Sequence, residues 1–251
     1  LVYADVEDSA YLLLQLLRRR GYPDPSVRGI LVSANGDSFS VTWNLPFESR
    51  VGRGADQSII ERVRFECEPG TLNFYRSIEI EGLSVLDDKL ARNFFMPSGV
   101  LFTRRSDRAF TSANFDSRIN RLLSVLRSKG YREAKVLDKD IEHDDNSGAV
   151  DLRLVVEEGP VFQVGRLQTL ILNSTGKQKS TVSEAYQGVL LNRSWIRDHR
   201  QELLNDWYAA GYPEAQVAVR EQRHSSSQDG VVVVDVTLEL TTGPYLELAA
   251  V

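Results

Sequence analysis

Several short clusters along the chain carry side chains that could do chemistry, beginning with His143-Asp144-Asp145. Imidazole and carboxylate groups are metal ligands, but a site needs three or four of them, and no second cluster lies near this one in the sequence. The polar residues around His143 favour a solvated loop. Asp198-His199 stands between Arg197 and Arg200. A polar helix face explains that pair better than acid-base catalysis, which requires a positioned partner group.

The remaining candidates have structural interpretations. Glu157-Glu158 are neighbours on an expected strand, where successive side chains point to opposite faces, so a shared proton is not expected. Gly52-Arg53-Gly54 lacks the Gly-Lys-Ser/Thr ending of a phosphate loop. We expect Cys67 to be a buried small hydrophobe and not a nucleophile. Ser180 and Ser183 have no His or Asp in register. We therefore expect no catalytic residue, no metal and no cofactor, and a protein that is not an enzyme.

Composition narrows the class further. The chain has 251 residues and a formal net charge of -5, whereas a nucleic-acid surface needs a basic stripe. The single cysteine excludes an internal disulfide. No stretch of the sequence approaches the roughly 20 apolar residues of a membrane helix. The abrupt first and last residues suggest a piece of a longer protein.

A sequence motif occurs three times and organises the chain. Its pattern is Gly-Tyr-x-acidic-small-x-Val, and we take three occurrences as an internal repeat. The copies are Gly21-Tyr22-Pro23-Asp24-Pro25-Ser26-Val27, Gly130-Tyr131-Arg132-Glu133-Ala134-Lys135-Val136 and Gly211-Tyr212-Pro213-Glu214-Ala215-Gln216-Val217.

An amphipathic helix is predicted before each copy, because apolar residues recur there at helical spacing. The glycine then ends the helix in a left-handed conformation, which only glycine adopts cheaply. The tyrosine can fold back on the last helical turn. The apolar positions are Val6, Leu13, Leu16 and Leu17 before the first copy, Phe115, Ile119, Leu122, Leu123 and Leu126 before the second, and Ile196, Leu203, Leu204 and Trp207 before the third.

Strands are predicted after each motif. In the second and third copies a polar loop, Asp138 to Gly148 or Arg223 to Gly230, leads to a return strand with alternating apolar residues. The return strands end at turns that contain Pro and Gly, and a new apolar strand follows, Phe74 to Ile80 or Phe162 to Leu172. The apolar residues of the two return strands are Val150, Leu152, Leu154 and Val156 in one, and Val232, Val234, Val236, Leu238 and Leu240 in the other.

The repeating unit is therefore strand, helix, helix, strand, strand. We expect three such modules, at residues 1–71, 72–159 and 160–245, with residues 246–251 beginning a further domain. The first module is expected to lack its first strand and first helix. Asn35-Gly36 signals a hairpin within it, and Leu45 to Ser58 reads as an insertion. Either 38–44 or 59–68 can be its third strand.

These features resemble POTRA domains. The resemblance rests on the Gly-Tyr motif, on Glu158-Gly159-Pro160 after an alternating strand, on Phe162-x-Val164-Gly165-x-Leu167, and on the Ile-Glu-Ile-Glu-Gly run at 78–82. It implies an α+β fold of tandem β-α-α-β-β POTRA modules, each a three-stranded mixed sheet covered by two helices. Three units favour the BamA/TamA barrel-assembly superfamily, since two-partner secretion transporters carry two units and the division protein FtsQ carries one.

The resemblance implies a function by contact. Such domains lie at the periplasmic face of the outer membrane, joined to a C-terminal membrane β-barrel, and bind extended outer-membrane protein clients, accessory lipoproteins or periplasmic subunits, but no nucleic acid. The second strand of each complete module is the expected docking edge, through β-augmentation. Its residues are Ala134, Lys135, Val136 and Leu137 in one module, and Ala215, Gln216, Val217, Ala218 and Val219 in the next. The alternative is an envelope-complex scaffold that binds fixed protein partners.

Overall fold

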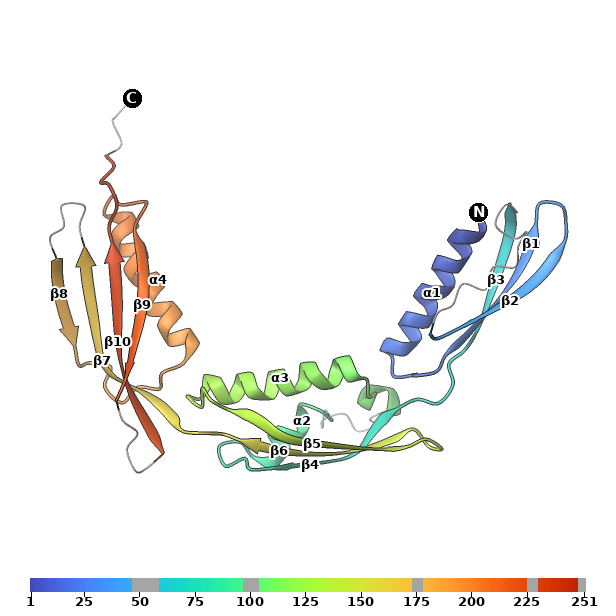
Figure 1. The fold of residues 1–251 in the computed structure, drawn as a ribbon, viewed down its shortest axis with the longest axis horizontal. Helices are drawn as coiled ribbons and strands as arrows, with labels where there is room; N and C mark the ends of the chain where they lie inside the picture. Colours follow the sequence, from blue (N-terminus) through green and yellow to red (C-terminus); the bar gives the residue numbers. More distant parts are fainter. Residues whose placement is uncertain (47–58, 97–103, 173–177, 225–229, 248–251) are drawn as a thin grey trace. The chain divides into compact units, whose positions relative to one another are not determined.

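The computed structural model describes residues 1–46, 59–96, 104–172, 178–224 and 230–247. The chain forms two compact units. The first comprises Leu1–Glu81, Leu86–Asn120 and Asp138–Val155, and the second comprises Gly82–Val85, Arg121–Leu137 and Val156–Val251. The described strands form three sheets (Figure 1), and we call each sheet with its helices the first, second and third module. The α+β class and the tandem plan are confirmed.

The first module has one helix and an antiparallel sheet of order β2-β1-β3. Its elements are α1 (Tyr3–Arg19), β1 (Ser26–Ser33), β2 (Ser38–Asn44) and β3 (Ile60–Glu68). Helix α1 buries Tyr3, Val6, Ala10 and Leu14 against the sheet. The expected inward position of Leu16 is wrong, because its side chain is 45% exposed. The face of α1 that packs against the sheet is instead the one that carries Val6, Ala10 and Leu14.

The strand after the first Gly-Tyr motif, β1, lies at the centre of its sheet. Strand β2 returns from a turn at Gly36 and pairs along one side of β1, and β3 pairs along the other. The hairpin predicted at Asn35-Gly36 is therefore confirmed. Most of the expected insertion, and Gly52-Arg53-Gly54 with it, lies outside the described residues.

The second module has the predicted plan. Its elements are β4 (Phe74–Glu81), α2 (Asp88–Asn93), the 3₁₀ turn η2 (Arg105–Arg108), α3 (Ser112–Ser128), β5 (Lys135–Asp144) and β6 (Ala149–Glu157). The sheet order is β4-β6-β5, and β4 runs parallel to β6. The expected loop from Asp138 to Gly148 is shorter than predicted, because β5 continues to Asp144. Polar residues tolerate this edge position because water solvates their side chains.

The third module differs from the expected three strands and two helices. Its sheet has four strands in the order β8-β7-β10-β9. Its elements are β7 (Val161–Leu172), β8 (Gln178–Ser183), α4 (Arg193–Ala209), β9 (Gln216–Arg223) and β10 (Val231–Thr241). Within the described residues between β7 and α4, a strand occupies the segment where a helix was expected. It pairs antiparallel with the outer edge of β7.

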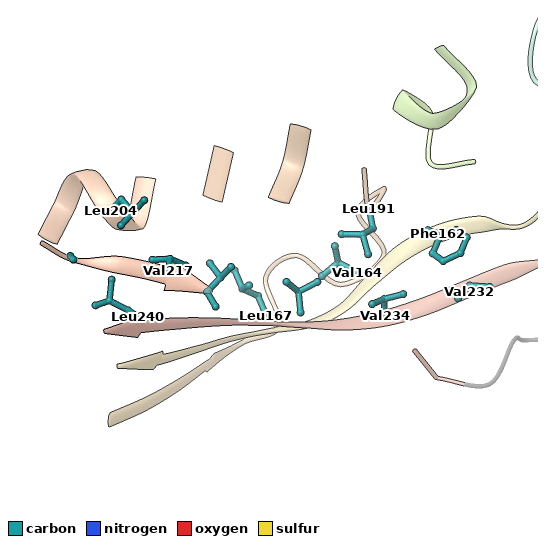
Figure 2. Packing of buried hydrophobic residues seen from close by; sticks show 12 residues of the cluster. Phe162, Val164, Leu167, Leu191, Leu204, Val217, Val232, Val234 and Leu240 are labelled. Carbon is teal, nitrogen blue, oxygen red and sulfur yellow. The ribbon is translucent and has the colours of Figure 1, made fainter. Parts of the chain in front are cut away.

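The core of the third module lies between its sheet and α4. Alternate residues of β10, from Val232 to Leu240, are buried, as the sequence pattern predicts for a central strand with one covered face. Figure 2 shows Val164, Val234 and other labelled side chains of the sheet gathered in this layer, with Leu204 of α4. Helix α4 and the edge strand β9 are thereby packed against the central strands β7 and β10.

The three helices that precede the motifs end identically. Each motif glycine has a positive φ, 99° at Gly21 and 94° at both Gly130 and Gly211. The tyrosine N–H that follows bonds to the carbonyl five residues back, as Tyr131 does to Leu126 at 3.1 Å. This is a Schellman ending, which satisfies carbonyls that the last helical turn leaves free. The predicted role of the glycine is confirmed.

Each motif glycine also holds the next segment of the chain. Its carbonyl accepts a bond from the backbone N–H of Asn73, Phe162 or Leu246, at 2.8–2.9 Å. A second glycine, after the last strand of each module, lies against the acidic residue of the motif. These second pairs are Gly70 with Asp24, Gly159 with Glu133, and Gly243 with Glu214. Because Gly70 follows β3, β3 and not β2 corresponds to the return strand of the first module.

Candidate functional site

Strand β5 lies at the edge of the second sheet, with β6 on its inner side. Ala134 comes immediately before the strand, is buried, and its carbonyl accepts a bond from Arg127 at 3.2 Å. The side chain of Lys135 pairs with Glu157 at 2.7 Å. Leu137 is 57% exposed. In the described part of the chain no strand pairs with the outer side of β5.

Strand β9 has the same position in the third sheet. It pairs antiparallel with β10, from Gln216 opposite Thr241 to Arg223 opposite Val234. Val217 is buried toward the core, whereas Gln216 and Ala218 are exposed. Of the predicted site residues, Ala215 precedes the strand and the other four lie in it. The structure thus places both predicted segments at sheet edges, and their binding role stays a prediction.

An edge strand offers main-chain groups to a partner. In an antiparallel pair, successive N–H and C=O groups alternate between the partner strand and the outer side. Half of the polar groups of β5 and β9 therefore face away from their sheets. A visiting extended chain can pair with them with little demand on its sequence. The arrangement supplies main-chain hydrogen bonds and shape.

The equivalent strand of the first module offers no such edge. β1 has β2 on one side and β3 on the other, so its main-chain groups are used within the sheet. The Gly-Tyr motif alone therefore does not determine which strand is free. The hairpin after Ser33 places β2 along the side of β1 that would otherwise be free.

Ion pairs engage the far end of β9. Arg132, from the second Gly-Tyr motif, donates to both carboxylate oxygens of Glu221 at 2.7 and 3.0 Å. Arg223 donates to Glu133 at 2.8 Å. Both guanidinium groups also lie over the Phe162 ring, at 5.3 and 5.0 Å from its centroid. Residues 216–219, the part of the predicted segment that lies in β9, stand outside these pairs.

Glu158 is a structural residue that the sequence analysis did not recognise. Its carboxylate accepts bonds from the backbone N–H groups of Ser84 and Val85 at 2.8 and 3.0 Å, and from the Ser84 hydroxyl at 2.5 Å. Burial raises the pKa of Glu158, but these hydrogen bonds outweigh it, so the pKa lies below its ordinary value. Glu157 instead pairs with Lys135, so the predicted divergence of the two carboxylates is confirmed.

The other titratable candidates form no reactive cluster. The ring of His143 packs edge-on against Phe110, with 5.3 Å between centroids. Asp198 is exposed, as expected, whereas His199 is half-buried and packs against Trp195 and Tyr186. Within the described ranges, no group of three or more His, Cys, Asp or Glu residues could hold a metal.

Cys67 is exposed, and the expected burial is wrong. It lies opposite Val27, which is fully buried. The two residues differ because Val27 is on the central strand, whereas Cys67 is near the end of the edge strand β3. Alternation along a strand predicts which face a residue takes, but not how far the covering helix reaches.

No helix in the described ranges is both long and apolar enough to cross a membrane. The comparison with curated proteins found no match. Several solved structures are similar at low sequence identity. POTRA domains 3–5 of BamA from Haemophilus influenzae are 16% identical, over 70% of this chain and 68% of that one, with a TM-score of 0.43.

POTRA domains 1–2 of Omp85 from Anabaena are 19% identical, over 70% of this chain and 97% of that one, with a TM-score of 0.33. CdiB from Escherichia coli is 14% identical, over 93% of this chain and 34% of that one, with a TM-score of 0.27. The family model of the POTRA domain, described as a surface antigen variable number repeat, matches residues 74–159. The second module, from β4 to the Glu-Gly-Pro turn, is therefore a POTRA domain.

Proposed function

We propose that this chain is the periplasmic polypeptide-docking region of an outer-membrane protein assembly or translocation factor. It binds extended client strands or accessory subunits by β-augmentation on β5 and β9, and it carries out no catalysis. The observation that carries the proposal is the position of both strands at sheet edges, each fixed from behind by a central strand. The POTRA match of residues 74–159 supports it.

The proposal treats residues 72–159 and 160–245 as the two docking modules. Each presents the strand after its Gly-Tyr motif as an edge, whereas the first module, residues 1–71, covers that strand with β2. Clients therefore dock on the second and third modules. The first module has a different role, such as contact with accessory subunits.

The exposed side chains of the edges suit varied clients. Along β9, the exposed Gln216 and Ala218 alternate with the buried Val217 and the half-buried Val219. Along β5, Leu137 is the exposed apolar side chain, whereas Val136 and Ile141 are half-buried. Main-chain pairing then supplies most of the affinity.

A photo-crosslinking amino acid placed on the edge tests this proposal. We would introduce it at Leu137 or at Ala218, and add peptides from the membrane strands of an outer-membrane protein. We expect crosslinks from both positions to several unrelated strand peptides, because main-chain pairing tolerates sequence variation. A crosslinker at Gln201, on the exposed side of α4, is the matched control and should capture none.

The outcomes separate the two function classes. Equal labelling from Gln201 and from the two edge positions would contradict docking at the edges. Crosslinks to one periplasmic protein and to no strand peptide would instead identify a scaffold with a fixed partner. In the docking case the crosslinked peptides should be extended, which isotope-edited infrared spectroscopy can detect.

A further inference from the structure

A cavity of about 430 Å³ lies in the second compact unit, where the end of α3 approaches the start of α4. We call it the joint pocket. Asn192 lines it, and its side chain donates to the carbonyl of Ser128 at 2.8 Å and accepts from the N–H of Trp195 at 2.9 Å. The residues that line it are Ser124, Arg127, Ser128, Arg132, Glu133, Asn192, Arg193, Ser194 and Arg223.

The joint pocket has an excess of positive charge. Four arginines line it, and two of them are neutralised by ion pairs, Arg132 with Glu221 and Arg223 with Glu133. Arg127 donates only to the carbonyl of Ala134. Neither Arg127 nor Arg193 pairs with a carboxylate in the part of the chain that the structure describes. Two cationic groups therefore share this cavity without a counter-charge.

The place of Arg193 is mildly unfavourable for the protein alone. Arg193 is the first residue of α4, where the helix dipole is positive and a cation is unfavourable. The basic ends of α1 and α3 suit the negative ends of their helices, but that explanation fails for Arg193. The first N–H groups of a helix also have no partner within it. The start of α4 thus adds donors and positive potential to the same cavity.

The preceding joint repeats this charge pattern within the first compact unit. A cavity of about 600 Å³ lies between the end of α1 and the start of α3. Arg19, Arg20 and Arg118 line it, together with apolar and uncharged polar residues, and no carboxylate is among its lining residues. Positive charge without a counter-charge therefore occurs at both joints. The two cavities, one in each compact unit, thus share this charge pattern.

We propose that the joint pocket binds a phosphate group, held by Arg127 and Arg193 from two different helices. A phosphate monoester carries about -1.5 to -2 charges near pH 7, which matches the two unpaired guanidinium groups, whereas one carboxylate would neutralise only one of them. Arginine binds phosphate with paired hydrogen bonds. The phosphate is free in solution or belongs to a lipid headgroup, and when bound it ties α3 to α4.

The test uses the whole 251-residue chain and phosphorus NMR titration with inorganic phosphate. The wild-type chain should bind, and the R127Q/R193Q double variant should bind at least about tenfold more weakly. R197Q/R200Q removes two arginines of α4 that are exposed, as Arg127 and Arg193 are, but do not line the pocket, and it should bind as the wild type does. R127K/R193K keeps the charges without the paired geometry and should bind with intermediate affinity.

Two results of the titration would overturn the site: no phosphate binding by the wild-type chain, or equal binding by R127Q/R193Q. A third would be that acetate stabilises the fold of the wild-type chain as much as phosphate does at the same concentration. Circular dichroism of each variant verifies that it is folded. Sedimentation with phosphatidylcholine vesicles, with and without phosphatidic acid, identifies the source of the phosphate. Vesicle binding that R127Q/R193Q loses indicates a headgroup, and binding of inorganic phosphate alone indicates free phosphate. Because edge docking has its own readout, either proposal can fail without the other.

Discussion

Arg166 donates two side-chain hydrogen bonds to one carboxylate oxygen of Asp235, at 3.1 and 2.9 Å, and its backbone N–H donates to the other at 2.9 Å. The two residues meet where the register of β7 and β10 shifts. His224 approaches the same carboxylate at 3.0 Å. Burial raises the pKa of Asp235, but bonds from His224 and Arg166 outweigh it and lower the pKa.

The second module repeats this arrangement. Arg76 lies where the register of β4 and β6 shifts, and its Nε donates to Asp151 at 3.0 and 3.1 Å. Hydrogen bonds from Arg76 and Ser77 lower the pKa of Asp151. A β-bulge on the first strand, an arginine within it and an aspartate on the central strand therefore recur together. Bulges re-aim side chains, and here the bulge turns the arginine toward the aspartate.

The first prediction concerns the carboxylate at the bulge. Asp235→Asn should lower the free energy of unfolding by about 1–3 kcal/mol, because it leaves Arg166 with a weaker acceptor at a partly buried site. Urea denaturation followed by circular dichroism measures the change. Asp198→Asn is the control, since Asp198 pairs with Arg197 on an exposed helix face. An equal loss in both variants would show that the bulge has no special role.

The parts of the fold that the sequence predicts correctly depend on neighbouring residues. The glycine of each Gly-Tyr motif needs only a positive φ and a helix before it, so three separate copies gave the same correct ending. The alternation of β10 and β6 likewise determined which side chains are buried. The edge positions of β5 and β9 followed from module topology, which the family resemblance supplied.

The parts that the sequence did not predict depend on pairing between distant segments. Strand β8, Gln178 to Ser183, is polar except for the exposed Val182, and it is a strand because β7 offers it a free edge. The central place of β1 likewise depends on where β2 and β3 pair. The joint pocket requires α3 and α4 to meet at their ends. Arg127 and Arg193 are far apart in the sequence, so the sequence could not predict that they lie in one cavity. An arginine at the start of an expected helix was the one available clue.

The second prediction compares two glycines with nearly equal backbone angles. Gly82 has φ +83° and Gly36 has φ +86°, so alanine is strained at both. A Cβ at Gly36 would meet nothing within 4 Å, whereas at Gly82 it would clash with the backbone carbonyl of Val156. Gly36→Ala should therefore cost about 1–2 kcal/mol of unfolding free energy, and Gly82→Ala should cost more than about 3 kcal/mol.

Thermal and urea unfolding of the two glycine variants measure this difference. If Gly82→Ala costs no more than Gly36→Ala, the close approach between the turn after β4 and the end of β6 is not rigid. The comparison needs no further control, because backbone strain is common to both variants and the carbonyl contact belongs to one of them.

The third prediction uses adjacent prolines on β9. Of the N–H groups of Val217 and Ala218, one points to β10 and the other outward, because they alternate. Val217→Pro and Ala218→Pro should therefore behave differently. The proline that removes the inward bond should cost about 3 kcal/mol or more, and the other should still fold, since edge strands tolerate proline, although Val217→Pro also loses a buried side chain. That folded variant should lose crosslinking to strand peptides from Gln216.

Two results would contradict docking on β9. One is unchanged crosslinking from Gln216 in the proline variant that folds normally. The other is an equal loss in that variant of crosslinking from Leu137 on β5, which would indicate a general disturbance and not a blocked edge. Hydrogen exchange of the β9 amides identifies which variant keeps its bonds to β10.

The fourth prediction concerns acid stability and Glu158. Its folded pKa lies below its ordinary value, so the native state binds fewer protons here than the unfolded state. The stability from this carboxylate is then fully present above the unfolded pKa, near 4.3, and is lost as the pH falls through the lower folded pKa. The third module has Thr242 at the equivalent position, 2% exposed, and gains no such pH dependence there.

Glu158→Gln should therefore lower stability at pH 7 and flatten its decline between about pH 5 and pH 3. Urea denaturation of both chains across that range gives the two slopes, and Ser84→Ala provides a graded comparison. It removes the hydroxyl donor but leaves the backbone N–H groups of Ser84 and Val85 in place, so its slope should fall between the others. Parallel slopes for wild type and Glu158→Gln would mean that the protons taken up in acid bind elsewhere. The carboxylate of the Glu-Gly-Pro turn would then act through its shape and hydrogen bonds rather than through its charge.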